Sequence, residues 1–518
     1  MKIKSKNYLI IISIPIILGI ITSLSLPPFN YLFLNFITLP LFLIFFLKNY
    51  EFDKIKSFII GWSFGFGYFI SNLYWLVNSL TFDENFKPLI PFAFVLLPLF
   101  IGLFYGLITL ICCFIKLNNN FNSLLIFASI FSIIEFIRGI IFGGFPWNYL
   151  VFSLSNYIEF IQILKIIGTD LLNFLVITIF LVPSIFFLKE NLYKKISVSF
   201  VVIIVVLANY IYGVTEIKNF DYADEKKLNS KIKIISPKIE IERYLYLNNP
   251  IQIINELIQL SKPNLNEKTI FIFPEGTLTG LSLSELKNFK SLFTKNFSKN
   301  HKIILGINSN YKSKIYNSLA VINDNVDTLA IYSKNKLVPF GEFLPFENLI
   351  KKFGFKKITQ GYQSFSPSKN REVIKINDIR FLPLICYEII YSGNLNKKKE
   401  IYDLILNISE DGWFKNSIGL DQHFSHSKFR AIEEGKNLIR VANNGTSAFI
   451  NPTGEIEKKI ESTDKGVFEV NSFRKTKKTI FSTFGNKLYF YFMFFYITLI
   501  FFLKLKGRNY EKKFFIHK

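Results

Sequence analysis

Long apolar stretches fill the first part of the chain. Seven of them lie within residues 1–213, and an eighth lies near residues 485–503. Each has about the 17 to 25 residues that a membrane-spanning helix needs. The seven lie near residues 8–26, 30–47, 57–80, 89–115, 124–143, 168–188 and 196–213. The pattern predicts a polytopic α-helical membrane protein of about eight spans, with an N-terminal membrane domain over residues 1–213 and a last helix and tail over residues 481–518.

The chain between the seventh and eighth stretches has a different pattern. In residues 214–480, short runs rich in β-branched and aromatic residues alternate with polar amphipathic segments, which is typical of an α/β domain. The expected strands cover residues 231–236, 269–274, 302–308, 318–323, 328–333, 379–385, 402–409 and 437–442. The expected helices lie near residues 250–262, 283–296 and 417–435. Residues 341–372 show little periodicity, which predicts a long loop. The overlapping Phe-rich segment 340–354 suits a lid.

Basic residues are unequally divided between the two sides of the expected spans. If the N-terminus MKIKSKN is cytoplasmic and the spans alternate, sixteen Lys and Arg residues of the N-terminus, short loops and C-terminal tail fall inside, whereas only Lys87 and Lys165 fall outside. Loops rich in Lys and Arg stay in the cytoplasm. Both termini are therefore expected in the cytoplasm, and the α/β domain is expected outside it.

The composition argues against several classes of protein, partner and site. Half of the 518 residues are hydrophobic, 19% are charged and the formal net charge is +23. This excludes a disordered chain. The basic excess is spread thinly, which disfavours a nucleic-acid partner. With three cysteines, four histidines and no Cys-x-x-Cys or Cys/His cluster, neither a structural disulfide nor a metal site is expected, and no cofactor is expected.

One pair of ionisable residues lies inside the fifth apolar stretch. Glu135 and Arg138 are three residues apart, so they lie on the same face of a helix. Charged groups inside a membrane are costly and are often functional. The spacing favours an ion pair between them over a direct role in binding substrate.

Three residues with catalytic chemistry each follow an expected strand. Glu275 follows FIFP, Lys334 follows TLAIYS and Cys386 follows FLPLI. Ligand sites of α/β sheets collect at the carboxyl ends of strands. A cysteine can accept an acyl group, a carboxylate can take its proton, and an ammonium can stabilise an oxyanion. Each residue also has an ordinary structural explanation, and spacing alone does not bring the three together.

The local sequences around these residues resemble a known family. The segments are FPEGT (273–277), YSKNKLVPFGEFLP (332–345), ICYE (385–388), residues 409–454 with NNG, and EFIRGIIFGGFPWN (135–148). They resemble the apolipoprotein N-acyltransferases, whose catalytic domain is similar to the nitrilase, or carbon–nitrogen hydrolase, superfamily. The resemblance covers nearly the whole chain. It implies a periplasmic αββα nitrilase-like domain over residues 214–480, in a multi-pass protein of the bacterial inner membrane.

The resemblance also implies roles for residues. Glu275 is expected to be the general base, Lys334 the oxyanion stabiliser and Cys386 the nucleophile, with Glu342 as an additional glutamate near the thiol. The supporting residues that match the family's motifs are Tyr387, Glu388, Trp413, Arg430, Asn443 and Asn444. Two segments depart from the usual pattern, namely ISPKIEIER (235–243) and SEDGWF (409–414).

The implied activity is the last step of lipoprotein maturation. Cys386 takes an acyl chain from a phospholipid, and the α-amino group of a diacylglyceryl-cysteine at the apolipoprotein N-terminus then receives it, with the chain acting as a monomer. One alternative is a membrane-tethered amidase or nitrilase that uses the same three residues with water as acceptor. A transporter or lipid-binding scaffold is the non-enzymatic alternative, although the spans lack a chain of ionisable groups. Release of lysophospholipid coupled to acylation of a diacylated peptide separates the three.

Overall fold

The computed structural model describes residues 2–244, 249–344, 364–393, 395–396 and 398–516. The chain forms two compact units. The helical unit comprises Met1–Tyr74, Pro91–Thr215 and Phe484–Lys518, and the sheet unit comprises Trp75–Ile90 and Glu216–Thr483. Most of the expected loop and lid, residues 345–363, lies outside the described residues.

In the part of the chain that the structure describes, eight long helices overlap the eight apolar stretches. They are α1 (Lys2–Ser23), α2 (Asn35–Asn49), α3 (Lys54–Leu73), α4 (Ile90–Ile115), α5 (Phe121–Arg138), α7 (Leu164–Leu181), α8 (Leu192–Asp221) and α14 (Lys487–Ile516). Among the described residues, five helical segments are long and apolar enough to cross a membrane, and they include α2, α4, α5, α7 and α8. The chain is therefore a membrane protein with an additional α/β part.

Two of these helices approach each other through glycine. A Cβ on Gly19 of α1 would lie 2.2 Å from the carbonyl oxygen of Phe64, and one on Gly67 of α3 would lie 2.1 Å from that of Ile16. No side chain fits at such distances. Small residues that let backbones approach are the usual means of packing helices in lipid.

The intramembrane ion pair predicted on α5 is present. Arg138 donates from Nε and Nη2 to the two carboxylate oxygens of Glu135, both at 2.9 Å, and both side chains are buried. Arg138 also donates to the carbonyl of Phe145, beyond the end of α5. The pair thus neutralises both charges and ties the helix to the loop that follows it.

The third span is shorter than the sequence predicts. Helix α3 ends at Leu73, and a 3₁₀ segment, Tyr74–Phe82, replaces its expected last turns. Within the sheet unit, the Trp75 ring lies against Phe414, with centroids 4.7 Å apart, and Asn78 donates to the Phe414 carbonyl at 2.9 Å. These contacts explain why an aromatic segment that looks like part of a span belongs to the sheet unit.

Two six-stranded sheets form the centre of the sheet unit. In the first, with order β12-β1-β2-β3-β4-β5, strands β1, β2 and β3 are parallel and the others pair antiparallel. In the second, with order β11-β10-β9-β8-β7-β6, strands β7, β8 and β9 are parallel. The strands of the first sheet are β1 (Glu225–Ser236), β2 (Thr269–Ile272), β3 (His301–Tyr311), β4 (Lys314–Ile322), β5 (Thr328–Ser333) and β12 (Gly466–Arg474). Those of the second are β6 (Ile374–Ile376), β7 (Ile379–Ile385), β8 (Leu404–Glu410), β9 (Asn437–Asn443), β10 (Ser447–Ile450) and β11 (Ile456–Ile460).

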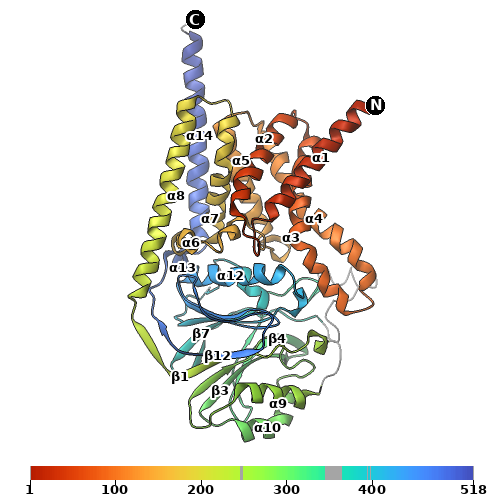
Figure 1. The fold of residues 1–518 in the computed structure, drawn as a ribbon, viewed down its shortest axis with the longest axis vertical. Helices are drawn as coiled ribbons and strands as arrows, with labels where there is room; N and C mark the ends of the chain where they lie inside the picture. The colour runs from red at the N-terminus through yellow and green to blue at the C-terminus, as the bar shows by residue number, and fades with distance from the viewer. Residues whose placement is uncertain (1, 245–248, 345–363, 394, 397, 517–518) are drawn as a thin grey trace. The chain divides into compact units, whose positions relative to one another are not determined.

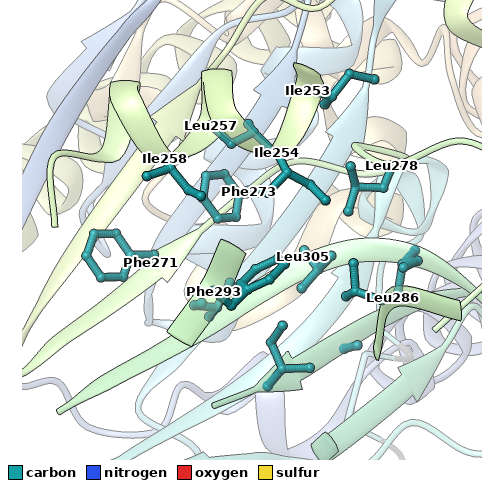
Figure 2. Packing of buried hydrophobic residues seen from close by; sticks show 14 of the residues in the cluster. Ile253, Ile254, Leu257, Ile258, Phe271, Phe273, Leu278, Leu286, Phe293 and Leu305 are labelled. Carbon is teal, nitrogen blue, oxygen red and sulfur yellow. The ribbon is translucent and has the colours of Figure 1, made fainter. Parts of the chain in front are cut away.

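Helices cover the outer faces of the paired sheets. Helices α9 (Pro250–Ser261) and α10 (Lys290–Asn296) lie on the first sheet, and α12 (Gly419–Glu434) lies on the second (Figure 1). The apolar face of α9, with Ile254 and Leu257, points into a cluster with Phe273 of the chain after β2 and Leu305 of β3 (Figure 2). The result is the αββα order expected from the resemblance.

The eight expected strands and three expected helices are present, with shifted ends. The sequence missed β6, β10 and β11, which have three to five residues, and also the nine-residue β12, most of which is only half-buried. Residues 157–167 form the short α6 (Ile158–Ile161) and the first turn of α7, which Gly168 breaks at φ +72°. The expected start of the sixth span at residue 168 matches this break.

A glycine in β3 fixes the loop that follows β2. The Gly306 N–H donates to the Pro274 carbonyl at 3.1 Å, and the Thr277 N–H donates to the Gly306 carbonyl at 3.2 Å. A Cβ on Gly306 would lie 2.5 Å from the Cα of Glu275 and 2.6 Å from the Gly276 nitrogen. Only glycine allows the loop to lie on the strand in this way.

We predict that Gly306→Ala destabilises the protein, since the new methyl group meets backbone that cannot move aside. Overpacking of this kind costs on the order of 1–3 kcal/mol, which exceeds the usual gain from replacing glycine in a strand. Thermal unfolding of the detergent-solubilised protein measures it. Gly466→Ala in β12, whose Cβ would lie 3.5 Å from Ile460, is the matched control and should unfold like the wild type. Equal unfolding temperatures for the two variants would contradict the steric argument.

Candidate active site

Two glutamates share one lysine in the interior of the sheet unit. Lys334, just after β5, places its Nζ 3.3 Å from Oε1 of Glu275 and 3.0 Å from Oε1 of Glu342. All three residues are buried, and Lys334 is only 1% exposed. The structure therefore brings together two predicted residues of the triad and the additional glutamate.

An asparagine that sequence reasoning missed joins the same two glutamates. Asn317 of β4 donates from Nδ2 to Oε1 of both Glu275 and Glu342, at 2.7 Å each. Its carbonyl also accepts the Lys334 N–H at 2.8 Å, because β4 and β5 are neighbours. Nothing in the run KIYNSLAVI distinguishes Asn317 from any polar strand residue, so only the strand pairing reveals its place.

The carboxylates are also held by backbone. Oε2 of Glu275 accepts the N–H of Glu410 at 2.9 Å, and Oε2 of Glu342 accepts the N–H of Val338 at 2.8 Å. Each carboxylate thus has one oxygen on Lys334 and Asn317 and the other on a main-chain donor. Such donors fix the direction of a carboxylate more firmly than mobile side chains do.

The third member of the triad sits on a strained turn. Cys386 follows β7, begins a 3₁₀ segment (Cys386–Ile390) and has φ +49°, a left-handed conformation that is uncommon for residues other than glycine. Its thiol is buried, and the charges of Glu275 and Lys334 both act on it. Backbone strain of this kind persists only where surrounding contacts hold it.

Glu388 is one of the contacts that hold this turn. Its carboxylate accepts the N–H of Ile385 at 2.8 Å, the N–H of Asn335 at 2.9 Å and a bond from Arg371 at 2.8 Å. The Tyr332 hydroxyl also donates to it, at 2.7 Å. Glu388 therefore links the turn of Cys386 to the chain on either side of Lys334.

A second buried network of polar side chains contacts the same turn at the Cys386 carbonyl. Asn407 of β8 lies 3.4 Å from the Cys386 carbonyl and accepts from Arg440 of β9 at 2.6 Å. Arg440 also donates to Asp411 at 2.7 Å, and Asp411 lies 3.0 Å from Nδ1 of His423. Burial alone would raise the pKa of Asp411, but the Arg440 charge and His423 hold it below its usual range. Sequence reasoning missed this network, because its members come from three separate elements.

The electrostatics of the site favour a neutral thiol beside charged partners. Burial and the nearby Glu275 charge raise the pKa of the Cys386 thiol, although Lys334 acts in the opposite direction. Burial would lower the pKa of Lys334, but the charges of Glu275 and Glu342 outweigh it and raise that pKa well above its usual range. Lys334 thus remains an ammonium, and the Cys386 thiol would need a base in order to act as a nucleophile.

The remaining predicted residues occupy different surroundings. The Trp413 ring lies 5.1 Å from that of Tyr244 and 5.7 Å from that of Phe82, and the Tyr387 ring lies 5.5 Å from that of Tyr391. Trp413 is thus part of an aromatic cluster within the sheet unit. Arg430 forms a buried ion pair with Glu433, one turn along α12.

The two asparagines of the NNG motif bind neighbours of the triad. Asn443 donates to the Ile239 carbonyl at 2.8 Å and to Glu410 at 2.7 Å, and Asn444 donates to the same carbonyl at 2.8 Å. They thereby join the two segments that depart from the family's usual pattern, because Ile239 belongs to the first and Glu410 to the second. Within the described part of the chain, His, Cys, Asp and Glu side chains form no group of three placed to hold a metal ion.

Comparison with known proteins identifies the family of the chain. Residues 18–182 match the apolipoprotein N-acyltransferase N-terminal domain, and residues 252–471 match the carbon-nitrogen hydrolase domain. The apolipoprotein N-acyltransferase of Rickettsia prowazekii is 32% identical over 82% of this chain and 85% of its own length. That of Rhizobium rhizogenes is 27% identical over 87% of this chain and 88% of its own.

Among solved structures, a CN-hydrolase superfamily protein from Xanthomonas campestris covers 47% of this chain and 90% of its own, with 14% identity and a TM-score of 0.34. The sequence relatives cover the helical and sheet units alike, and the helices, the paired sheets and the motifs fit the same family. The chain belongs to the apolipoprotein N-acyltransferase family.

Proposed function

We propose that the chain transfers an acyl chain from a membrane phospholipid to the α-amino group of a diacylglyceryl-cysteine at the N-terminus of an apolipoprotein, through a thioester on Cys386. The observation that carries the proposal is the buried cluster in which Lys334 contacts both Glu275 and Glu342 beside the strained turn of Cys386. This set supplies a base, a cation and a nucleophile in one place, as acyl transfer requires.

The first half-reaction loads the enzyme. Glu275 takes the proton of the Cys386 thiol as the sulfur attacks the ester carbonyl of the phospholipid. The Lys334 ammonium stabilises the oxyanion of the tetrahedral intermediate. When the intermediate collapses, the bond to the glycerol oxygen breaks, and Glu275 returns its proton to that oxygen, so that lysophospholipid leaves and a thioester remains.

The second half-reaction transfers the acyl chain from Cys386 to the acceptor. The amine of the acceptor attacks the thioester carbonyl, and Glu275 takes a proton from the attacking nitrogen. The second tetrahedral intermediate again places its oxyanion beside Lys334. Expulsion of the sulfur gives the amide, and the proton held by Glu275 returns to Cys386. Because the thiol is neutral at rest, the same carboxylate serves in both directions.

Glu342 acts on Lys334 in this scheme. Its 3.0 Å contact with Nζ, the shared Asn317 and the Val338 N–H hold the ammonium in place. An ammonium has three donors, so its two carboxylate partners leave one for the oxyanion. One chain supplies every residue of the site, which supports action as a monomer.

The substrates and the apolar helices support a location in the bacterial inner membrane. Both the donor and the acceptor are anchored in lipid, and the chain carries at least five segments suited to spanning it. The distribution of lysines and arginines supports cytoplasmic termini and a periplasmic sheet unit.

The coupling of the two products tests the activity. Purified protein with phosphatidylethanolamine and a diacylated cysteinyl peptide is expected to yield lysophospholipid and N-acylated peptide in equal amounts, measured by mass spectrometry. Cys386→Ala should abolish both products, and Glu275→Gln and Lys334→Ala should lower both by at least 100-fold. Cys112→Ala, at the buried cysteine of α4, is the matched control and should keep activity.

Free fatty acid in place of acylated peptide would contradict the proposal and favour a hydrolase. Products from Cys386→Ala at the wild-type rate would remove the assignment of the nucleophile.

The two ends of one helix test the topology. Tyr193 is 82% exposed near the start of α8, and Tyr222 is 88% exposed just after its end. In intact cells with a permeable outer membrane, a membrane-impermeant maleimide is expected to label Tyr222→Cys but not Tyr193→Cys. After lysis, both should react. Labelling of Tyr193→Cys alone in intact cells would reverse the orientation.

A further inference from the structure

We propose that Arg243 and Glu410 form a buried clamp that positions Glu275 for proton transfer. The proposal rests on the function assigned above to Glu275. It adds two positioning residues, whose side chains act on Glu275 through the Gly276 carbonyl and the Glu410 N–H. It also accounts for the contact of Glu275 Oε2, the carboxylate oxygen that does not contact Lys334.

The clamp holds Glu275 at two points. The N–H of Glu410 donates to Oε2 of Glu275 at 2.9 Å, and Nε of Arg243 donates to the carbonyl of Gly276, the next residue, at 3.2 Å. One contact therefore directs the carboxylate, and the other holds the backbone that carries it. Neither contact depends on Lys334.

The two holding residues are joined to each other. Nη2 of Arg243 forms an ion pair with Oε2 of Glu410, and their side chains are 0% and 1% exposed. A buried pair of this kind is rigid when each charge has a partner, and removal of one partner leaves a buried charge alone. A shift of either residue therefore moves the other, and through them Glu275.

The remaining polar groups of the pair are also satisfied. Nη1 of Arg243 donates to the carbonyls of Ile239 and Glu240, at 3.2 and 2.8 Å. Glu410 accepts from the Gly412 N–H at 2.8 Å and from Asn443 at 2.7 Å. A fully bonded buried network specifies one geometry, which is what a base needs in order to meet the thiol in the correct direction.

The pair also joins the two segments whose sequences depart from the usual pattern, since Arg243 ends one and Glu410 lies in the other. The buried Arg243 cation in the first segment requires an anion nearby, and Glu410 in the second segment supplies it. One ion pair thus joins the two segments.

Single-turnover acylation of Cys386 by phospholipid, with kcat and KM from steady-state turnover, tests the clamp. Glu410→Gln keeps the shape and removes the charge, and Arg243→Met keeps the length and removes charge and donors. Each is expected to slow thioester formation on the order of tenfold or more, with the KM for phospholipid within about twofold of wild type, because misplacement of a catalytic group affects the chemical step.

Two further variants separate positioning from general damage. The double variant Arg243→Met/Glu410→Gln should be no slower than the slower single variant, since both act through one pair. Arg243→Lys restores a cation for Glu410 but not the forked geometry, so it should be faster than Arg243→Met and slower than wild type. Arg380→Met, which breaks the ion pair with Asp403 at the start of β7, is the control and should acylate at the wild-type rate.

Each outcome of these measurements supports or overturns the proposed clamp. If Arg243→Met does not fold, Glu410→Gln alone carries the test. Wild-type acylation rates in Glu410→Gln would overturn the clamp, as would equal slowing in Arg380→Met or a multiplicative effect in the double variant. If the wild type itself forms no thioester, the proposed function fails before the clamp is reached.

Discussion

The candidate active site depends on one buried ammonium shared by two carboxylates. Glu275 and Glu342 both lie within 3.3 Å of Nζ of Lys334, in an interior where two unpaired negative charges would repel each other strongly. Asn317 donates to the same two oxygens and reduces that repulsion further. The charges of the two glutamates in turn outweigh the effect of burial on Lys334 and raise its pKa well above the usual range.

This arrangement explains the protonation state of Cys386, the proposed nucleophile. The site holds two negative charges and one positive charge, so its formal charge is negative, and burial disfavours a second anion. The pKa of Cys386 is raised accordingly, and the thiol keeps its proton until a substrate carbonyl arrives. A neutral resting thiol suits an acyl-transfer enzyme, because a permanently charged thiolate would react with other electrophiles. The strained turn, tied by Glu388 to the segment around Lys334, keeps the sulfur at the cluster.

The helices, the Glu135–Arg138 ion pair and the strands before the candidate site residues could be predicted from the sequence, because each depends on a local pattern. Apolar runs of spanning length identify helices by themselves, and Glu135 and Arg138 meet because they lie on one helical face. The strands that precede Glu275, Lys334 and Cys386 are apolar enough to be recognised, and the motifs after them are local. The features that the sequence did not predict depend on contacts between residues far apart in the chain. Asn317 reaches the glutamates through strand pairing, the Arg243–Glu410 pair joins residues 167 positions apart, and the aromatic segment after α3 belongs to the sheet unit although its composition resembles a span.

The central claim is that Cys386 carries the acyl chain between donor and acceptor. Intact-protein and peptide mass spectrometry, after incubation with phospholipid alone, tests it most directly. The account predicts one acyl group per chain, on the peptide that contains Cys386, released by hydroxylamine as a thioester should be. A protein that turns over both substrates without any adduct on Cys386, or with the acyl group on another residue, would contradict it.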